Sequence, residues 1–515
     1  MDFYGKDHIL TPFLWKTLQE RINTMIFNSL QFLIFFPIIL VSYYIIPHRL
    51  QNIWLLFASY IFYGFWNVKY CLILFICTLV TYLAALAIES VRTEFSLKKR
   101  VFIIALLFVL GILAGYKYTN FAVGNLISLF EKLGVHTRLH KFDIVLPVGI
   151  SFFTFQAAGY LIDVYKGKIS SEKDLIRYGL FVSFFPQLLS GPIGRADMLL
   201  PQYSKERNFQ YENFQSGLLL MIWGFFLKLV IADRAAILVD TVYDDFTKYT
   251  GLTIVFATAI YGVQIYCDFF GYSSMAIGSA KILGIDLPNN FDTPYLSASV
   301  KEFWRRWHIS LSSWLRDYVY FPLGGSRCST IRKYFNLAMT FFVSGIWHGS
   351  KWSFIFWGLL HGFYQITGDL LAPVRKMICS KLRINTQTGI FKVFRIILTF
   401  IMVDFAWLFF RADGFMNGLR MCKRIATQFH PLSLVGDAVY KLGLDQKNYR
   451  LLMFSIAVLL IRDILTYMGI DLKKWFLAQN WLFRELAAAF SILFIILVGI
   501  WGNSYHAANF IYFQF

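Results

Sequence analysis

The chain has 515 residues, of which 57% are hydrophobic and only 15% are charged, and its mean hydropathy is +0.55. Soluble domains carry about 25% charged residues, so this composition excludes a string of soluble domains and indicates an integral membrane protein. The formal net charge of +19 comes mostly from basic residues in short loops between apolar runs, which favours contact with anionic membrane lipids and disfavours nucleic acid as a partner.

A helix of about 20 apolar residues crosses a hydrocarbon core of ~30 Å, and runs of this length recur along the whole sequence. The first begins at Met25, so we interpret residues 1–24 as an N-terminal extension and 25–515 as one transmembrane domain. The predicted fold is all-α and polytopic, with about 11–13 transmembrane helices. The expected spans are 26–47, 51–67, 70–89, 101–116, 143–164, 175–190, 215–240, 251–280, 334–370 as two passes, 390–411, 450–468 and 484–503.

Three polar segments interrupt these spans, at 191–214, 286–333 and 412–449, and the last is expected to hold a loop or short amphipathic helices. Lys and Arg are concentrated in 91–100, which predicts a cytoplasmic position for that segment. With three spans before it, the N-terminus is expected outside. Simple alternation then predicts an outer loop at 117–141.

A carboxylate, Asp268, lies inside an otherwise apolar segment. Burial disfavours a charged carboxylate unless a cation or a histidine pairs with it. Two interpretations follow for this side chain. It bridges helices, or it orients a catalytic histidine.

The most informative segment is 301–317, where aromatic residues recur at helical spacings of three and four with cationic residues between them. One interpretation is an anchoring helix that lies in the membrane interface and has no chemical role. The other is the wall of a vestibule open to the cytoplasm, whose arginines attract a phosphate-bearing donor. The aromatic face consists of Trp304, Trp307, Leu311 and Trp314, and the arginines are Arg305, Arg306 and Arg316.

An imidazole is predicted deep in the membrane at His348. The apolar run from Tyr334 to Trp347 rises about 20 Å as a helix, which is too short to cross the bilayer. If 301–333 is cytoplasmic, His348 therefore lies beyond mid-depth. A titratable ring there is costly unless it meets a cavity or a partner, and imidazole suits a proton acceptor. The alternative is a hydrogen-bonded structural histidine. Farther along, His361 is expected to be a helix-contact residue.

Other patterns carry less chemistry. Asp404 and Arg411 are expected to form an internal, structural pair. The six cysteines have neither metal-ligand nor disulfide spacing, so no metal site is predicted. The sequence contains no P-loop, dinucleotide fingerprint, GxSxG elbow or HExxH motif, which disfavours an ATP-driven pump and a serine hydrolase.

Taken together, several short motifs resemble the membrane-bound O-acyltransferase (MBOAT) family, in the bacterial branch that includes membrane subunits of alginate and peptidoglycan O-acetylation. The resemblance covers about residues 25–515. The segments that carry it are 303–312 (FWRRWHISLS), 320–325 (YFPLGG) and 346–349 (IWHG), supported by 147–156, 190–193, 267–273 and 510–515.

This resemblance implies a ring of tilted helices, with re-entrant and interfacial helices, around a central tunnel in the bacterial inner (cytoplasmic) membrane. His348 matches the catalytic histidine of the family and His308 a second functional position. In related systems an activated acyl group enters from the cytoplasm and leaves on an acceptor at the outer face. The depth inferred for His348 from helix length agrees with that route. The remaining tunnel or orienting candidates are Asp268, Trp347, Trp304 and Ser310.

The leading hypothesis is acetyl transfer from a thioester donor, most simply acetyl-CoA, with no bound cofactor. Arg305, Arg306 and Arg316 attract the donor, His348 acts as general base or acyl carrier, and an acetyltransferase partner outside the membrane modifies an exported polysaccharide or peptidoglycan. A second hypothesis is D-alanyl transfer to teichoic acid. A third is a transporter or flippase in which Asp268 and His348 form a proton pathway.

Overall fold

The computed structural model describes residues 25–91 and 93–501. Within these residues it contains helices and no strands. The predicted all-α class is confirmed, while the extension at 1–24 and the motif at 510–515 lie outside the described residues. The helices of the first half are α2 (Leu30–Ile45), α3 (His48–Gly64), α4 (Val68–Ser90), α5 (Phe95–Lys132), α6 (Ile150–Tyr165), α7 (Leu175–Ser183), α8 (Phe185–Leu188), α9 (Ala196–Tyr203), α10 (Tyr211–Phe225), η1 (Phe226–Ala232), α11 (Asp233–Tyr243), η2 (Phe246–Lys248) and α12 (Gly251–Ile282).

The second half begins with short helices and continues with longer ones. Its elements are η3 (Pro294–Leu296), α13 (Val300–Arg306), α14 (Ile309–Leu315), η4 (Arg316–Tyr320), α15 (Thr330–His348), α16 (Trp352–Leu370), α17 (Ala372–Lys381), α18 (Gly389–Arg411), α19 (Phe415–Thr427), η5 (Gly436–Lys441), α20 (Gln446–Tyr467), α21 (Leu472–Leu477) and α22 (Trp481–Val498). The segment 334–370, predicted as two membrane passes, forms the two helices α15 and α16, but neither is among the helices that are long and apolar enough to cross a membrane.

In the described part of the chain, six helices are long and apolar enough to cross a membrane, fewer than the 11–13 expected from apolar runs. The others are shorter or more polar. The span expected at 175–190 is divided into α7 and α8, because Pro186 has no N–H to bond to the preceding turn of a continuous helix. The outer loop expected at 117–141 is also wrong in its first half, since α5 continues to Lys132.

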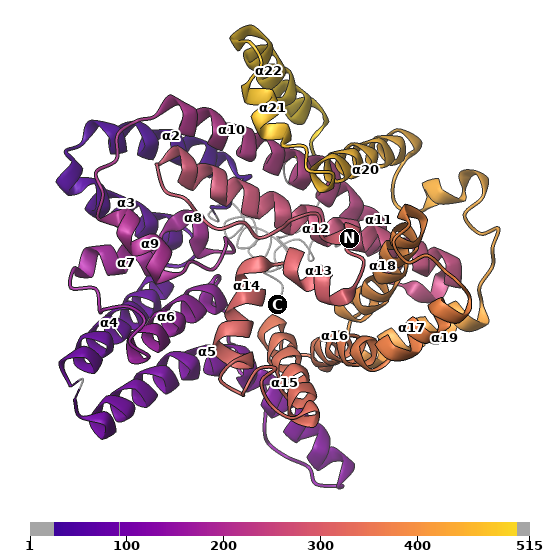
Figure 1. Cartoon of the computed structure of the whole chain (residues 1–515), viewed down its shortest axis with the longest axis horizontal. Helices are drawn as coiled ribbons and strands as arrows, with labels where there is room; N and C mark the ends of the chain where they lie inside the picture. Colours follow the sequence, from indigo (N-terminus) through magenta and orange to yellow (C-terminus); the bar gives the residue numbers. More distant parts are fainter. Residues whose placement is uncertain (1–24, 92, 502–515) are drawn as a thin grey trace, which may run out of the picture.

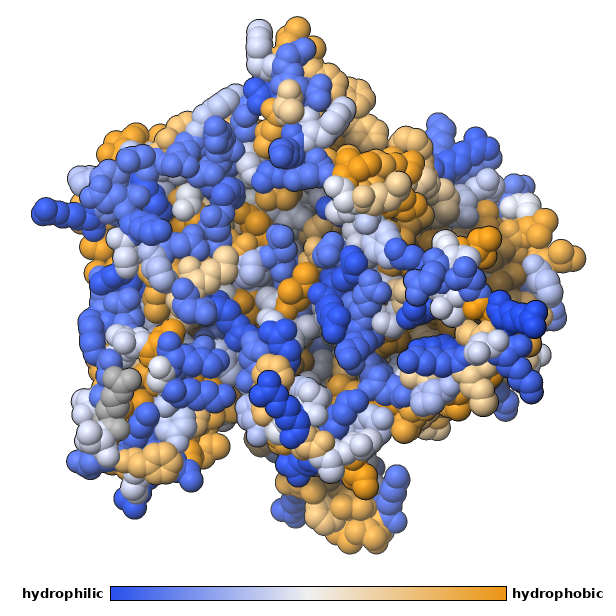
Figure 2. Space-filling view, in the orientation of Figure 1, coloured by the Kyte–Doolittle hydropathy of each residue, from blue (hydrophilic) through white to orange (hydrophobic). Residues whose placement is uncertain are grey.

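Helices from distant parts of the sequence surround two short central helices. Figure 1 shows α13 and α14 in the middle of the view, with α12, α15, α16 and α18 around them. Figure 2 shows hydrophilic residues over much of the middle of this face and many hydrophobic residues toward its rim. This distribution suits a disc of helices surrounded by lipid.

Helices α10 and α12 pack closely against each other. A Cβ added to Gly224 would lie 2.6 Å from the carbonyl oxygen of Gly271, and one added to Gly217 would lie 2.5 Å from that of Gly278. Glycines seven residues apart on both helices therefore let the two backbones touch. This crossing brings η1, the π-helical continuation of α10, beside the middle of α12.

Candidate active site

The central segment is broken at His308. That residue has φ 44° and ψ 54°, a left-handed conformation that separates α13 from α14. Such a backbone costs about 1–3 kcal/mol in a residue other than glycine, so the surroundings must hold it. The segment 301–317 therefore forms two short helices and not the one continuous helix that its aromatic periodicity suggested. Its aromatic face is also buried, with Trp304 7% exposed and Trp314 6% exposed.

Asn290 holds the break from the preceding loop. Its backbone carbonyl accepts a hydrogen bond from Ile309 N at 3.0 Å, and its Oδ1 accepts one from Ser310 Oγ at 2.7 Å. Its Nδ2 donates to Ser273 Oγ on α12 at 3.1 Å. Ser310 Oγ in turn accepts from Ile193 N at 3.0 Å. Ser310 thus fixes the strained turn, and Asn290, which the sequence analysis missed, is its main partner.

His348 is the last residue of α15, and its ring is oriented by its own helix. The Nδ1 atom lies 2.7 Å from the carbonyl oxygen of Ser344. Because a carbonyl oxygen only accepts, Nδ1 carries the proton, and in the neutral ring the lone pair is on Nε2. The side chain is 3% exposed and packs against Trp357 at 4.7 Å and Phe410 at 5.6 Å between ring centroids.

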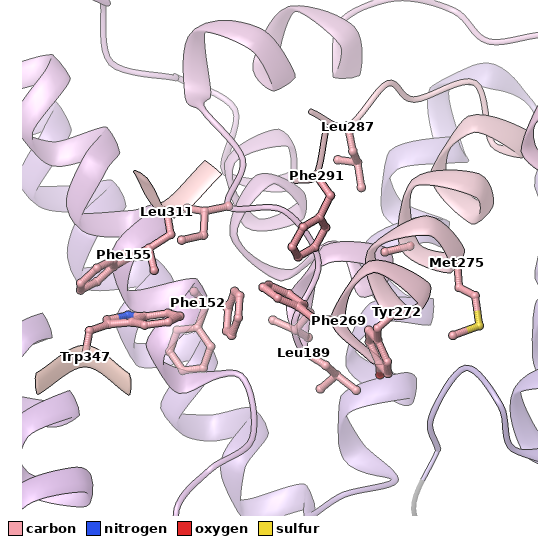
Figure 3. Packing of buried hydrophobic residues seen from close by; sticks show 14 of the residues in the cluster. Phe152, Phe155, Leu189, Phe269, Tyr272, Met275, Leu287, Phe291, Leu311 and Trp347 are labelled. Atoms are coloured by element: carbon pink, nitrogen blue, oxygen red, sulfur yellow. The ribbon is translucent and has the colours of Figure 1, made fainter. Parts of the chain in front are cut away.

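One indole ring lies between the two predicted histidines. The ring centroid of Trp347 is 4.9 Å from that of His348 and 5.8 Å from that of His308. Trp347 also contacts Phe152, with 5.4 Å between ring centroids. His308 contacts Phe269, with 4.6 Å between ring centroids. Figure 3 shows Trp347 and Phe152 on one side of this core and Phe269 on the other. The structure therefore brings His308 and His348 to one aromatic cluster.

A cavity of about 780 Å³ lies between the central segment and the pair α15 and α16. One face of α15 forms its wall through Lys333, Leu337, Phe341 and Ser344. These residues follow one another at helical spacing, and the next turn along the same face carries His348. The cavity thus ends about 6 Å along the helix from the imidazole. His348 itself is not among the residues that line the cavity.

Cationic side chains surround this cavity. Arg316 and Lys333 line it but bind carboxylates, Asp317 at 2.9 Å and Asp369 at 2.7 Å. Two further cations, Lys301 and Arg305, also line it, and within the described residues no carboxylate lies within the 4.0 Å ion-pair limit of either. They are available to a bound anion.

Arg306, the third predicted donor-binding arginine, points elsewhere. Its Nε donates to Glu302 at 3.1 Å and its Nη1 to Asp292 at 3.3 Å, and it is not among the residues that line the cavity. Of the predicted donor-binding set, the cavity therefore contains Arg305 and Arg316. Arg306 stabilises the connection between η3 and α13.

An aromatic layer separates the cavity from His348. Trp304 and Phe341 line the cavity and lie 5.2 Å apart between ring centroids. Behind them, Trp357 is 5.7 Å from Trp304 and also contacts His348. His361 is fully buried in this layer, 5.1 Å from both Trp304 and Trp357. Its packing agrees with the helix-contact role predicted for it.

The cavity lies on the same side of the protein as the basic segment 91–100. Lys98 is positioned over the ring of Tyr165, at the end of α6. Near that end, Asp163 accepts a hydrogen bond of 2.6 Å from the hydroxyl of Tyr318 in η4, and η4 adjoins the cavity. The cavity therefore lies near the segment that is predicted to be cytoplasmic.

Asp268 belongs to a buried ion cluster. Its carboxylate lies 2.7 Å from the ammonium of Lys228, which also binds Asp233 at 2.8 Å. All three side chains are at most 3% exposed. Since the Ser344 carbonyl binds His348 Nδ1, the structure supports the helix-bridging interpretation of Asp268. The sequence analysis missed Lys228, although a lysine inside a long apolar run was a usable signal.

The internal pair expected between Asp404 and Arg411 is not formed. Arg411 Nη2 instead binds Asp240 of α11 at 2.5 Å and lies 3.8 Å from Asp244. Two residues seven positions apart on a helix are nearly two turns apart, so their side chains are separated along the axis. Arg411 therefore ties the end of α18 to α11.

Comparison with known proteins places the chain in a family. The model of the MBOAT, membrane-bound O-acyltransferase family matches residues 168–404, which include both histidines. The probable alginate O-acetylase of Pseudomonas aeruginosa is 37% identical over 398 residues, covering 77% of this chain and 74% of that protein. The peptidoglycan O-acetyltransferase of Helicobacter pylori is 34% identical over 436 residues, covering 78% and 80%.

A teichoic acid D-alanyltransferase of Streptococcus thermophilus is less similar, at 29% identity over 327 residues, covering 56% of this chain and 77% of that protein. The two acetyltransferase relatives match over most of both chains, and the predicted resemblance is confirmed. This chain belongs to the membrane-bound O-acyltransferase family.

Proposed function

We propose that this acyltransferase is an O-acetyltransferase of the bacterial cytoplasmic membrane. In this proposal it takes an acetyl group from a cytoplasmic thioester, acetyl-CoA, and delivers it toward the outer face. The observation that carries the proposal is a cationic cavity whose α15 wall continues directly to a histidine with its Nδ1 proton fixed. The names of the acetyltransferase relatives support acetyl as the transferred group.

The entrance of the cavity suits the polar end of the donor. Lys301 and Arg305 are cations without a carboxylate partner in the described part of the chain, and phosphate groups are their natural ligands. The acyl end of the donor extends toward Ser344 along the apolar wall. To reach His348 it passes Trp304 and Phe341, so one of these rings turns aside during the reaction.

At His348 the chemistry is proton transfer and addition. Nε2 accepts the proton of an acceptor hydroxyl while the hydroxyl oxygen adds to the thioester carbon. The resulting intermediate expels the thiolate, which takes the proton from His348 and leaves as the free thiol. Ser344 keeps the ring in the required tautomer throughout. His308, held at the same indole, is the second polar group of the site.

The final acceptor in this proposal is an exported glycan. The relatives are named for alginate and for peptidoglycan, and both are polymers with free hydroxyls outside the cytoplasm. We therefore propose that an acetyltransferase partner outside the membrane takes the acetyl group from this protein and places it on the polymer.

The test uses the purified full-length protein with acetyl-CoA, a soluble glycan acceptor and the acetyltransferase partner, and it follows both thiol release and ester formation. We expect His348→Ala to lower the rate about 10²–10⁴-fold, the usual contribution of a general base. His140→Ala, at an exposed histidine outside the site, is the matched control. Full activity of His348→Ala would refute the base role. Activity with a D-alanyl carrier protein and none with acetyl-CoA would replace the proposed donor.

A further inference from the structure

A buried lysine on α5 contacts the end of the helix that carries His348. Lys117 is 8% exposed and lies in a helix that is long and apolar enough to span the membrane. Its Nζ donates to the carbonyl oxygen of Trp347 at 2.5 Å and lies 5.8 Å from the centroid of the Trp347 ring. Within the described residues no carboxylate is close enough to form an ion pair with it.

The contact satisfies a specific need of α15. The last four carbonyls of any helix have no partner in that helix, and those of α15 lie in a buried region without bulk water to bind them. Lys117 takes the carbonyl of Trp347, and the adjacent Tyr118 donates to that of Ile346 at 2.8 Å. Gly349, which follows, is extended and continues the chain away from the helix. Two consecutive residues of α5 therefore cap the end of α15.

The cap controls the reacting ring through one peptide unit. The Trp347 carbonyl held by Lys117 belongs to the peptide bond that joins Trp347 to His348. The same lysine lies against the indole that separates the two histidines. The amine of Lys117 thus contacts both the peptide unit that carries His348 and the indole ring beside it.

We propose that Lys117 is a positioning residue for acyl transfer, which places His348 and Trp347 by binding the Trp347 carbonyl. The inference rests on the function proposed above. A general base that is misplaced by about 1 Å loses about 10²-fold in rate. Loss of the amine therefore lowers kcat and leaves the KM for the thioester nearly unchanged, because the donor's phosphates bind at the other end of the cavity.

The experiment compares Lys117→Met, Lys117→Arg, Tyr118→Phe and the exposed α5 control Lys99→Met in the full-length protein. We expect Lys117→Met to lower kcat about 10–100-fold with KM changed less than about twofold. Lys117→Arg, which keeps an N–H donor at this position, holds kcat within about fivefold of the unmodified protein. Tyr118→Phe has a smaller effect, since the Ile346 carbonyl is one residue farther from the imidazole.

Three outcomes overturn the inference: unchanged kcat in Lys117→Met, a rise in KM in place of a fall in kcat, or no recovery in Lys117→Arg at equal membrane abundance. If Lys117→Met does not accumulate, Lys117→Gln, which keeps an N–H donor, is compared with Lys117→Arg by the same kcat criterion. Failure of the proposed function is distinct, because then the unmodified protein transfers no acyl group or His348→Ala stays active.

Discussion

Removing Lys228 should destabilise the protein severely, because it leaves two buried carboxylates without their cation. The ammonium lies 2.8 Å from Asp233 and 2.7 Å from Asp268, and all three side chains are at most 3% exposed. Breaking a buried ion pair by removing one partner costs about 3–5 kcal/mol. Lys228→Met should therefore lower the free energy of unfolding by at least this much. It leaves two buried carboxylates without this cation, whereas breaking an ordinary ion pair leaves one.

Thermal unfolding of the detergent-solubilised protein measures this effect. We expect the apparent melting temperature of Lys228→Met to fall by about 5 °C or more. Lys248→Met, which removes an exposed partner of Asp245 with side chains 73% and 43% exposed, should not change it measurably. Adding Asp233→Asn and Asp268→Asn to Lys228→Met should recover most of the loss. If Lys228→Met melts like Lys248→Met, the cluster does not stabilise this fold.

Three further predictions follow from the backbone and the cavity. His308→Gly should be about 1–2 kcal/mol more stable than His308→Ala in thermal unfolding, because glycine tolerates φ 44°; equal stability would mean that the turn is unstrained. Gly345→Ala should lower the free energy of unfolding by about 1–3 kcal/mol, because the added Cβ would lie 2.5 Å from Phe354 O. Gly368→Ala is the control, because a Cβ there meets open space. Arg305→Gln should raise the KM for acetyl-CoA about fivefold, or about 1 kcal/mol, and Arg306→Gln should not; the reverse order would place the donor elsewhere.

Features set by local sequence were predictable. Apolar length located most helices and predicted that 334–370 holds two of them, which are α15 and α16. Helix length, with 301–333 taken as cytoplasmic, predicted His348 deep in the protein, and the structure shows it buried behind an aromatic layer next to a cavity lined by basic residues. The family resemblance was based on short local motifs, such as 303–312 and 346–349, and it is confirmed.

Features set by distant contacts were not predictable. The periodicity of 301–317 favoured one helix, but Asn290 and Ser310 hold a left-handed turn at His308 that no helical pattern reveals. The apolar run that ends at residue 116 suggested a loop after it, yet α5 continues to Lys132, and Lys117 within it binds the end of α15.

The central claim is that a thioester enters the cavity beside Arg305 and reaches His348. The direct measurement is an experimental structure of the full-length protein with an acetyl-CoA analogue in which a methylene replaces the thioester sulfur. We predict phosphates at Lys301 and Arg305, a displaced Trp304 or Phe341, and a carbonyl carbon within about 6 Å of His348 Nε2, which leaves room for one hydroxyl oxygen. An analogue whose acyl end stays on the cavity side of an intact aromatic layer would contradict the account.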